Sequence, residues 1–365
     1  MRFHRTRAGI RAGSAVVLLV LLALIPVAGV FAGGGQEEGA AAEDEAAGGD
    51  MEADAPAGRV AVVFGRGGLG DESFNDAAFR GLEMANEELG VEFDYAEPQA
   101  VAEFEPLLTQ FAAQGQYDLI VSIGFEQGDA LGAVAQEFPE QNFAIIDTVV
   151  DQPNVASYTY AEQERGFLMG AAAALVTQNA DYEMANDAGR VAVVGGVQSP
   201  LIDANIAGYI AGAKYISEDV SVAHGYVGSW ADPARGKEIA ISMIEDGADV
   251  VWGAAGRSGL GVLDATMERG VYGIGADSDQ GSVAPGHVLT NGMKFVDETM
   301  FIAIETTLAG NFEGGVNTLG VEEGALGYTE SLMSEETIER LQEVEEVIIS
   351  GEVDIPTTVE DARSM

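Results

Sequence analysis

The sequence predicts an α/β protein of two doubly wound parallel-sheet lobes joined by a hinge, and three observations lead to this prediction. The run RVAVV at residues 59–63 recurs letter for letter at residues 190–194. An acid follows 59 residues after the start of each copy, Asp118 in the first and Asp249 in the second. The matched runs are short, apolar and rich in β-branched residues, as strands buried on both faces should be, and helical patterns separate them.

The chain begins with an expected export signal over residues 1–32. Four arginines among the first eleven residues precede a nearly continuous apolar run, and Val30 and Ala32 occupy the −3 and −1 positions of a cleavage site after residue 32. A retained N-terminal membrane anchor is the alternative, because the apolar run is long enough to span a bilayer. Residues 33–57 are acidic and contain no aromatic or β-branched residue, which predicts a disordered linker.

Composition excludes several classes of function. The formal net charge of −43 would repel nucleic acid and anionic lipid, so we expect neither as a partner and interpret the acidity as adaptation to salt. The sequence has no cysteine, which excludes disulfides, thiolate metal sites and a lipid anchor on cysteine. With three histidines in the chain, metal binding is not expected either. Lysine is so rare that each one is a candidate for a specific role.

The remaining elements place a candidate site. Residues 76–89 and 237–246 have helical patterns, and a third strand in each copy ends on an acid, Asp147 or Asp277. We expect lobe 1 to comprise residues 58–160 and 276–315, lobe 2 residues 161–275 and 316–350, and a tail residues 351–365. Ligands of open α/β sheets bind beyond the carboxyl ends of the strands, so two facing lobes predict a site in the cleft between them.

A glycine-rich loop offers an alternative function. Residues 65–70 (GRGGLG) match the G-x-G-x-x-G fingerprint of dinucleotide-binding enzymes. However, Asp71 or Ser73 is the better N-cap for the following helix, which leaves the glycines in an extended loop instead of at a helix N-terminus. An exported dinucleotide-binding enzyme therefore stays the alternative to a binding protein without a cofactor.

Several segments resemble the basic membrane protein family, the substrate-binding proteins that include the purine nucleoside receptors of ABC importers. The segments occur in family order and span about residues 59–310; they are GDESFNDAAFRGLEMA (70–85), EQERGFLMGAAAAL (162–175), VAVVGGVQSP (191–200), GYVGSWADPARGKEIA (225–240), GADVVWGAAGRSGLGV (247–262), IGADSDQ (274–280) and APGHVLTNGMKFVD (284–297).

The resemblance implies a type I periplasmic-binding-protein fold and a set of ligand-binding residues. Two aromatic rings, Phe74 and Trp230, would enclose a base, and Asp277 and Lys294 would hold ribose hydroxyls. Asp129 would lie near the base, Gly256 would line the cleft, and Asn75 would make a polar contact. Stacking of a base on an aromatic ring contributes about 1–3 kcal/mol, which suits the two rings to this role.

The sequence also departs from the family pattern. Gly65-Arg66 stands where nucleoside receptors often carry an acid, and Asp203-Ala204-Asn205 stands where a basic and aromatic run is usual, so the selectivity for the base is open. We expect an exported, monomeric, periplasmic or cell-surface protein that binds a purine nucleoside without catalysis and delivers it to an ABC permease. A nucleoside-sensing surface protein of the same fold is the further alternative.

Overall fold

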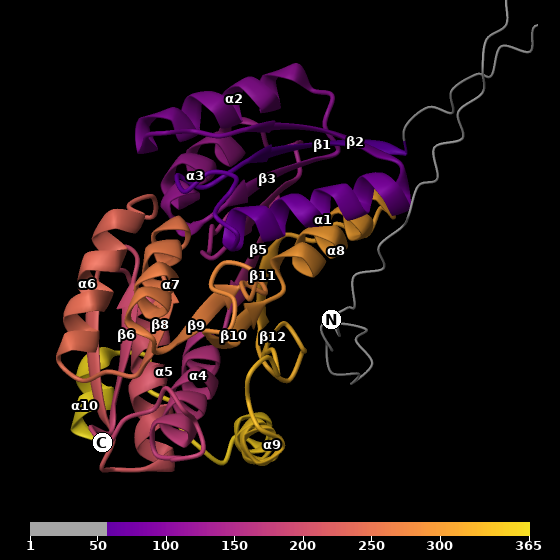
Figure 1. Ribbon diagram of the computed structural model, residues 1–365. Helices are drawn as coiled ribbons and strands as arrows, with labels where there is room; N and C mark the ends of the chain where they lie inside the picture. Colours follow the sequence, from indigo (N-terminus) through magenta and orange to yellow (C-terminus); the bar gives the residue numbers. More distant parts are fainter. Residues whose placement is uncertain (1–56) are drawn as a thin grey trace, which may run out of the picture. The chain divides into compact units, whose positions relative to one another are not determined.

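The computed structural model describes residues 57–365, which form two six-stranded sheets flanked by helices (Figure 1). The predicted export signal and nearly all of the predicted acidic linker lie outside these residues. The first sheet has the strand order β11-β5-β4-β3-β1-β2, and all of its pairs are parallel. Its strands are β1 (Gly58–Val63), β2 (Val91–Ala96), β3 (Leu119–Ile123), β4 (Phe143–Ile146), β5 (Val155–Tyr160) and β11 (Gly315–Leu319).

The second sheet repeats this design. Its order is β12-β10-β9-β8-β6-β7, and its pairs are parallel except for the antiparallel pairing of β10 with β12. Its strands are β6 (Arg190–Gly195), β7 (Ser221–Tyr226), β8 (Val250–Ala254), β9 (Tyr272–Asp277), β10 (Val288–Lys294) and β12 (Leu326–Tyr328).

The repeated sequence forms the same strand pairing, in the same register, in both sheets. Val60 pairs with Leu119 in the first sheet, and Val191 pairs with Val250 in the second. The offset of 59 residues is thus the same in both sheets. The predicted class of two doubly wound parallel sheets is confirmed.

Helices cover both faces of each sheet, because alternate residues of a strand point to opposite faces. In the first sheet, Val60 and Val62 pack toward α1 and α8, whereas Ala61 and Val63 pack toward α2 and α3. The helices of this lobe are α1 (Phe74–Leu89), α2 (Phe104–Gln114), α3 (Gly128–Glu137) and α8 (Val296–Leu308), with 3-10 turns η1 (Val101–Glu103) and η2 (Phe125–Gln127). Those of the second lobe are α4 (Glu162–Thr177), α5 (Pro200–Ile216), α6 (Pro233–Glu245), α7 (Arg257–Arg269), α9 (Glu335–Ser350) and α10 (Val359–Ser364).

The chain passes between the lobes three times, and the last two passages differ from the expected boundaries. We placed residues 276–315 in lobe 1, but β10 (Val288–Lys294) pairs with β9 in the second sheet. We placed residues 316–350 in lobe 2, but β11 pairs with β5 in the first sheet. The chain therefore leaves the second sheet after Lys294, adds α8 and β11 to the first lobe, and returns to form β12. The fully buried β10 completes the interior of the second sheet, so the chain stays in this lobe past residue 276, where we expected it to leave.

The last fifteen residues are also not the tail that we expected. Their helix α10 packs on α5, with Ala362 buried. Lys214 Nζ, near the end of α5, donates to the carbonyl oxygens of Ala362 and Arg363 at 3.0 and 3.2 Å. A lysine that bonds the last carbonyls of a helix satisfies acceptors that have no partner within the helix.

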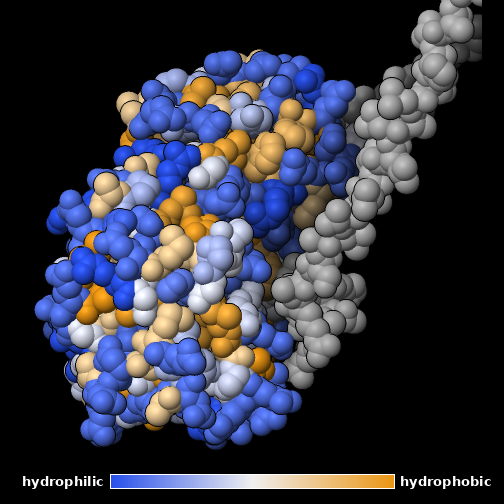
Figure 2. Space-filling view, viewed as in Figure 1, coloured by the Kyte–Doolittle hydropathy of each residue, from blue (hydrophilic) through white to orange (hydrophobic). Residues whose placement is uncertain are grey.

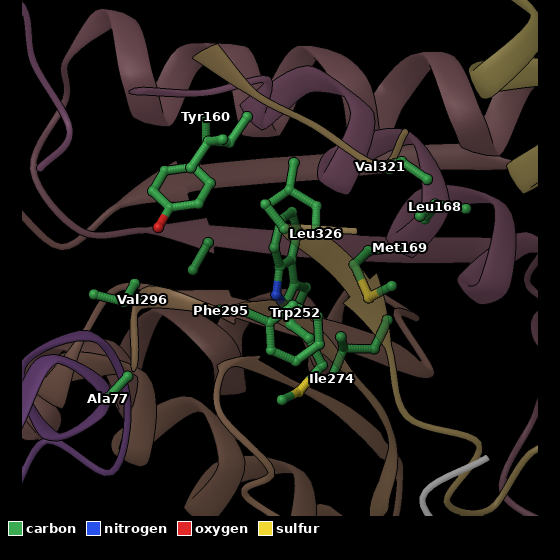
Figure 3. Close-up of a cluster of buried hydrophobic side chains, with 14 of the residues drawn as sticks. Ala77, Tyr160, Leu168, Met169, Trp252, Ile274, Phe295, Val296, Val321 and Leu326 are labelled. Atoms are coloured by element: carbon green, nitrogen blue, oxygen red, sulfur yellow. The ribbon is translucent and has the colours of Figure 1, made fainter. Parts of the chain in front are cut away.

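The largest apolar cluster is continuous through both lobes. It includes Ala77, Tyr160 and Val296 of the first lobe and Met169, Trp252 and Ile274 of the second, all of which are labelled in Figure 3. On the face shown in Figure 2, hydrophilic residues predominate and apolar residues lie in small groups between them. Of the helices in residues 57–365, none combines the length and the apolar character that a membrane crossing needs.

Glycines bring α4 and α5 unusually close. A Cβ atom added at Gly170 would lie 2.0 Å from the carbonyl oxygen of Tyr209, and one added at Gly208 would lie 2.1 Å from that of Gln163. Gly166 and Gly212 make equally close approaches across the same crossing. Because α4 and α5 both carry residues of the cleft, this backbone contact fixes the position of one wall of the candidate site.

Candidate functional site

A cavity lies between the two lobes at the carboxyl ends of their strands. Its empty space is about 710 Å³, counting the part that is open to solvent. The structure brings six of the seven predicted site residues to its wall: Phe74, Asn75, Trp230, Gly256, Asp277 and Lys294. We name this space the cleft cavity.

The two predicted aromatic rings border the cleft cavity from different lobes. Phe74 begins α1, and Trp230 lies in the loop between β7 and α6. The Trp230 ring packs over Gly196, where an added Cβ would lie 2.3 Å from Cζ3. It also meets Phe125 of the first lobe edge-to-face, with the ring centroids 6.3 Å apart. Among the described residues, no ring contact joins Phe74 to Trp230.

The loop before α1 is held by a buried carboxylate. Asp71 accepts backbone N–H bonds from Ser73, Asn75 and Asp76, which satisfies donors that the start of a helix leaves free. Burial raises the pKa of Asp71 to about 6 in spite of these bonds. The side chain of Asn75 is bonded at both ends, since Oδ1 accepts from the Gly65 N–H and Nδ2 donates to Asp71. Asn75 thus fixes the loop at the cavity wall.

The helix begins at Phe74, so the glycines of residues 65–70 lie in the loop before it and not at its N-terminus. This agrees with the expectation that the loop lacks the geometry of a dinucleotide fingerprint, in which the glycines open the helix.

Five buried charged side chains form an ion cluster on the floor of the cleft cavity. Lys294 Nζ lies 2.5 Å from Asp147 Oδ1 and 2.7 Å from Glu162 Oε1. Arg165 pairs with Glu162 at 2.7 Å and with Asp277. Three carboxylates thus face two cations, and every member is at least nine-tenths buried.

The pKa values within the ion cluster follow from the balance between burial and these charges. Burial raises the pKa of Asp147 to about 6 against the opposing attraction of Lys294. Burial alone would also raise the pKa of Asp277, but the charges of Arg165 and Lys294 outweigh it and hold that pKa below its usual range. Burial would lower the pKa of Lys294, and the charges of Asp147 and Glu162 raise it instead.

The two acids that end the matched strands share an unusual backbone. Asp147 has φ 79° and Asp277 has φ 65°, in the left-handed region that aspartate tolerates better than most residues. Both carboxylates point into the same ion cluster, Asp147 from the first lobe and Asp277 from the second. The duplication therefore extends to the backbone of the site.

Direct contacts join the lobes beside the cleft cavity. Ser73 Oγ of the first lobe donates to Asp277 Oδ2 at 2.5 Å, and Gln280 Nε2 of the second lobe donates to the Glu72 carbonyl at 3.0 Å. Arg257, at the start of α7, donates across the cleft to the carbonyl of Leu69. The lobes are thus closed on one another, with Asp277 bonded to both.

The structure does not bring Asp129 to the cleft cavity. Asp129 lies on the first turn of α3 and is exposed, because the turn η2 intervenes and presents Phe125 and Glu126 to the cavity instead. Glu126 is paired with Arg66, whose Nε donates to Glu126 Oε2 at 3.0 Å and whose Nη2 donates to Oε1. Sequence reasoning named Arg66 only as a departure from the family and missed Glu126.

Sequence reasoning also missed Glu162 and Arg165. The signal was present, because these two charges stand at i and i+3 immediately before the wholly apolar run GFLMGAAAAL. Charged residues that head such a run are buried with it at the start of α4, and buried charges need partners.

Comparison with known proteins finds a matching family and several similar chains. Residues 59–359 match the family described as ABC transporter substrate-binding protein, PnrA-like. An uncharacterised lipoprotein of Pyrococcus abyssi is 34% identical over 77% of this chain and 71% of its own length. Basic membrane protein A of Borreliella burgdorferi is 31% identical over 86% of this chain and 91% of its own.

Solved structures share the fold. A solute-binding protein of an ABC transporter system from Aeropyrum pernix is 32% identical, covers 84% of this chain and 95% of its own, and superposes with a TM-score of 0.77. An ABC transporter solute-binding protein from Actinobacillus succinogenes, solved with bound D-allose, is 13% identical with a TM-score of 0.60, which shows the fold alone. The periplasmic-binding-protein type I fold expected from the sequence is confirmed.

Proposed function

This chain belongs to the PnrA-like family of ABC transporter substrate-binding proteins, and from that premise we propose that it binds a purine nucleoside in the cleft cavity and delivers it to a membrane permease. The observation that carries the proposal is the pair of aromatic side chains, Phe74 from one lobe and Trp230 from the other, at the wall of one cavity. A nucleobase offers two π-faces, and rings on separate lobes would bind both faces only when the lobes are closed.

In this proposal the sugar lies toward the ion cluster. The carboxylate of Asp277 has about four lone-pair sites, of which Arg165 and Ser73 occupy two. The others are free to accept from ribose hydroxyls, and Lys294 borders the same space. Gly256, at φ 56°, allows the backbone to approach the ligand beside Trp230.

The proposal includes no catalytic step. The charged side chains of the floor are paired with one another and leave a surplus of one carboxylate, which suits the binding of an uncharged ligand and disfavours an anion. We propose that the protein is exported to the periplasm or the cell surface and acts as a single chain. Relatives are named lipoproteins, but this sequence contains no cysteine that could carry a lipid.

A thermal-shift panel tests the proposal. Inosine, guanosine and adenosine are compared with ribose, glucose and free amino acids in molar salt. A ligand that binds only the folded state adds about 2.7 kcal/mol at a hundredfold excess over Kd, so nucleosides should raise Tm by several degrees and ribose far less.

A pair of variants controls for unspecific effects. Trp230→Leu should abolish most of the nucleoside-induced shift, whereas Tyr215→Leu, at an exposed ring outside the cleft cavity, should preserve it. A panel in which sugars or amino acids raise Tm and nucleosides do not would overturn the proposed ligand class.

A further inference from the structure

We propose that Arg66, held by Glu126, reads the base and selects 6-oxopurine nucleosides, inosine and guanosine, over adenosine. This inference rests on the proposed function and concerns a residue that stands where the family often has an acid. Arg66 lines the cleft cavity beside Gly65 and Gly67 in the loop that precedes Phe74.

The pairing with Glu126 fixes one side of the guanidinium and leaves another free. Arg66 uses Nε and Nη2 to bond the two carboxylate oxygens of Glu126, a side-on bidentate pair. Within residues 57–365, no protein acceptor takes the Nη1 hydrogens, and Nη2 keeps a second hydrogen. The end-on face of the guanidinium therefore offers two parallel donors in a fixed plane.

Two parallel donors require two adjacent acceptors on the ligand. A 6-oxopurine presents O6 and N7 side by side, which is the edge that arginine recognises in guanine. Adenine presents N7 beside the N6 amino group, so a donor of Arg66 would face a donor of the base. The arrangement of donors thus favours inosine and guanosine.

The charges of the cleft cavity disfavour the other ligands with paired acceptors. A carboxylate or phosphate would also fit the end-on face of an arginine. However, Arg66 is already neutralised by Glu126, and the ion cluster carries three carboxylates against two cations, with Asp71 as a further buried acid nearby. An anionic ligand would add to this surplus of negative charge, whereas a nucleoside base is neutral.

Calorimetric titration of the full chain with inosine, guanosine, adenosine and 7-deazaguanosine tests the inference. The 6-oxopurines should bind roughly tenfold to a hundredfold more tightly than adenosine, the discrimination that one bidentate arginine–base contact supplies. 7-Deazaguanosine lacks one of the two acceptors and should bind measurably more weakly than guanosine. This comparison needs no variant, so it stands even if a substitution at residue 66 prevents folding.

Arg66→Gln should reduce the preference for guanosine over adenosine to less than about threefold, mainly by weakening guanosine. Arg59→Gln is the matched control, because Arg59 is similarly exposed (37% against 34%) and similarly paired with acids, but lies at the far end of β1. It should preserve the preference.

The outcomes separate the inference from the function on which it rests. Nucleosides that all bind with equal affinity, or a preference that survives Arg66→Gln, would overturn the role of Arg66 and leave nucleoside binding intact. Failure of every nucleoside to bind would overturn both. Tighter binding of a carboxylate, tested with citrate and glucuronate, would also overturn both.

Discussion

Replacement of Lys294 by methionine tests the ion cluster, because Lys294 is its central cation. Its Nζ bonds both Asp147 and Glu162, its side chain is 2% exposed, and it lies 4.5 Å from the centroid of the Tyr160 ring. Methionine fills similar volume without the charge. The variant therefore leaves Asp147 buried with no cationic partner in contact.

At pH 7 the loss should be large. Removal of one partner from a buried ion pair costs about 3–5 kcal/mol, because the remaining charge is left uncompensated in a medium of low dielectric. We expect the free energy of unfolding, measured by urea denaturation in molar salt, to fall by that amount.

The loss should shrink at lower pH, and its sign follows from Asp147. With Lys294 present, the pKa of Asp147 is about 6, already above the value of about 3.9 in an unfolded chain. Removal of Lys294 raises the folded-state pKa further, so the variant binds more protons when folded than when unfolded between about pH 4 and 7. Its stability therefore decreases as pH rises through this window, and the difference from the parent chain should be smaller at pH 5 than at pH 7.

Lys237→Met is the matched control. Lys237 also pairs with two acids, Asp264 and Glu268, both at 2.7 Å, but on the solvent-exposed outer side of α6 and α7. Its loss should leave the free energy of unfolding almost unchanged at both pH values. Equal effects of the two substitutions, or a Lys294→Met effect that is independent of pH, would refute the assignment of a buried, proton-linked cluster.

Three further predictions concern the scaffold. Gly170→Ala should destabilise the chain by about 1–3 kcal/mol or more, since the new Cβ would lie 2.0 Å from the Tyr209 carbonyl oxygen. Gly132→Ala in α3, where the new Cβ would make only ordinary contacts, should instead stabilise the chain by up to about 1 kcal/mol. Urea unfolding measures both effects. Asp71 is buried and has a pKa of about 6, so it makes the parent chain less stable as pH rises from about 4 to about 6. Asp71→Asn should remove this contribution, and a plot of the free energy of unfolding against pH should fall less steeply over that range. Tm should rise with salt up to molar levels, because a net charge of −43 repels itself and the Debye length falls from ~30 Å at 0.01 M to ~3 Å at 1 M; a flat profile would contradict adaptation to salt.

The sequence predicted the architecture well because the signal was repeated. Two equivalent sheets could be predicted from the matched strands, their common offset of 59 residues and the acid at the end of the third strand in each copy. The structure adds that these two acids, Asp147 and Asp277, share a left-handed backbone conformation. The helices over residues 76–89 and 237–246 are confirmed as α1 and α6, since each has one apolar face against a sheet.

Contacts between distant parts of the chain were harder to predict. β11 pairs in the first sheet with β5, a strand more than a hundred residues earlier in the chain, and β12 returns to pair with β10 in the second sheet; no local pattern specifies either pairing. The docking of α10 on α5 depends likewise on Lys214, whose partners are backbone carbonyls without a sequence signature. Asp129 was misplaced because one 3-10 turn shifts which side chains reach the cavity.

A crystal structure of the chain grown with saturating inosine tests the central claim most directly. The account predicts one inosine in the cleft cavity, with the base between Phe74 and Trp230 and the ribose toward Asp277 and Lys294. Inosine found only on the outer surface, or a cleft cavity that holds a ligand of another class in its presence, would contradict the claim.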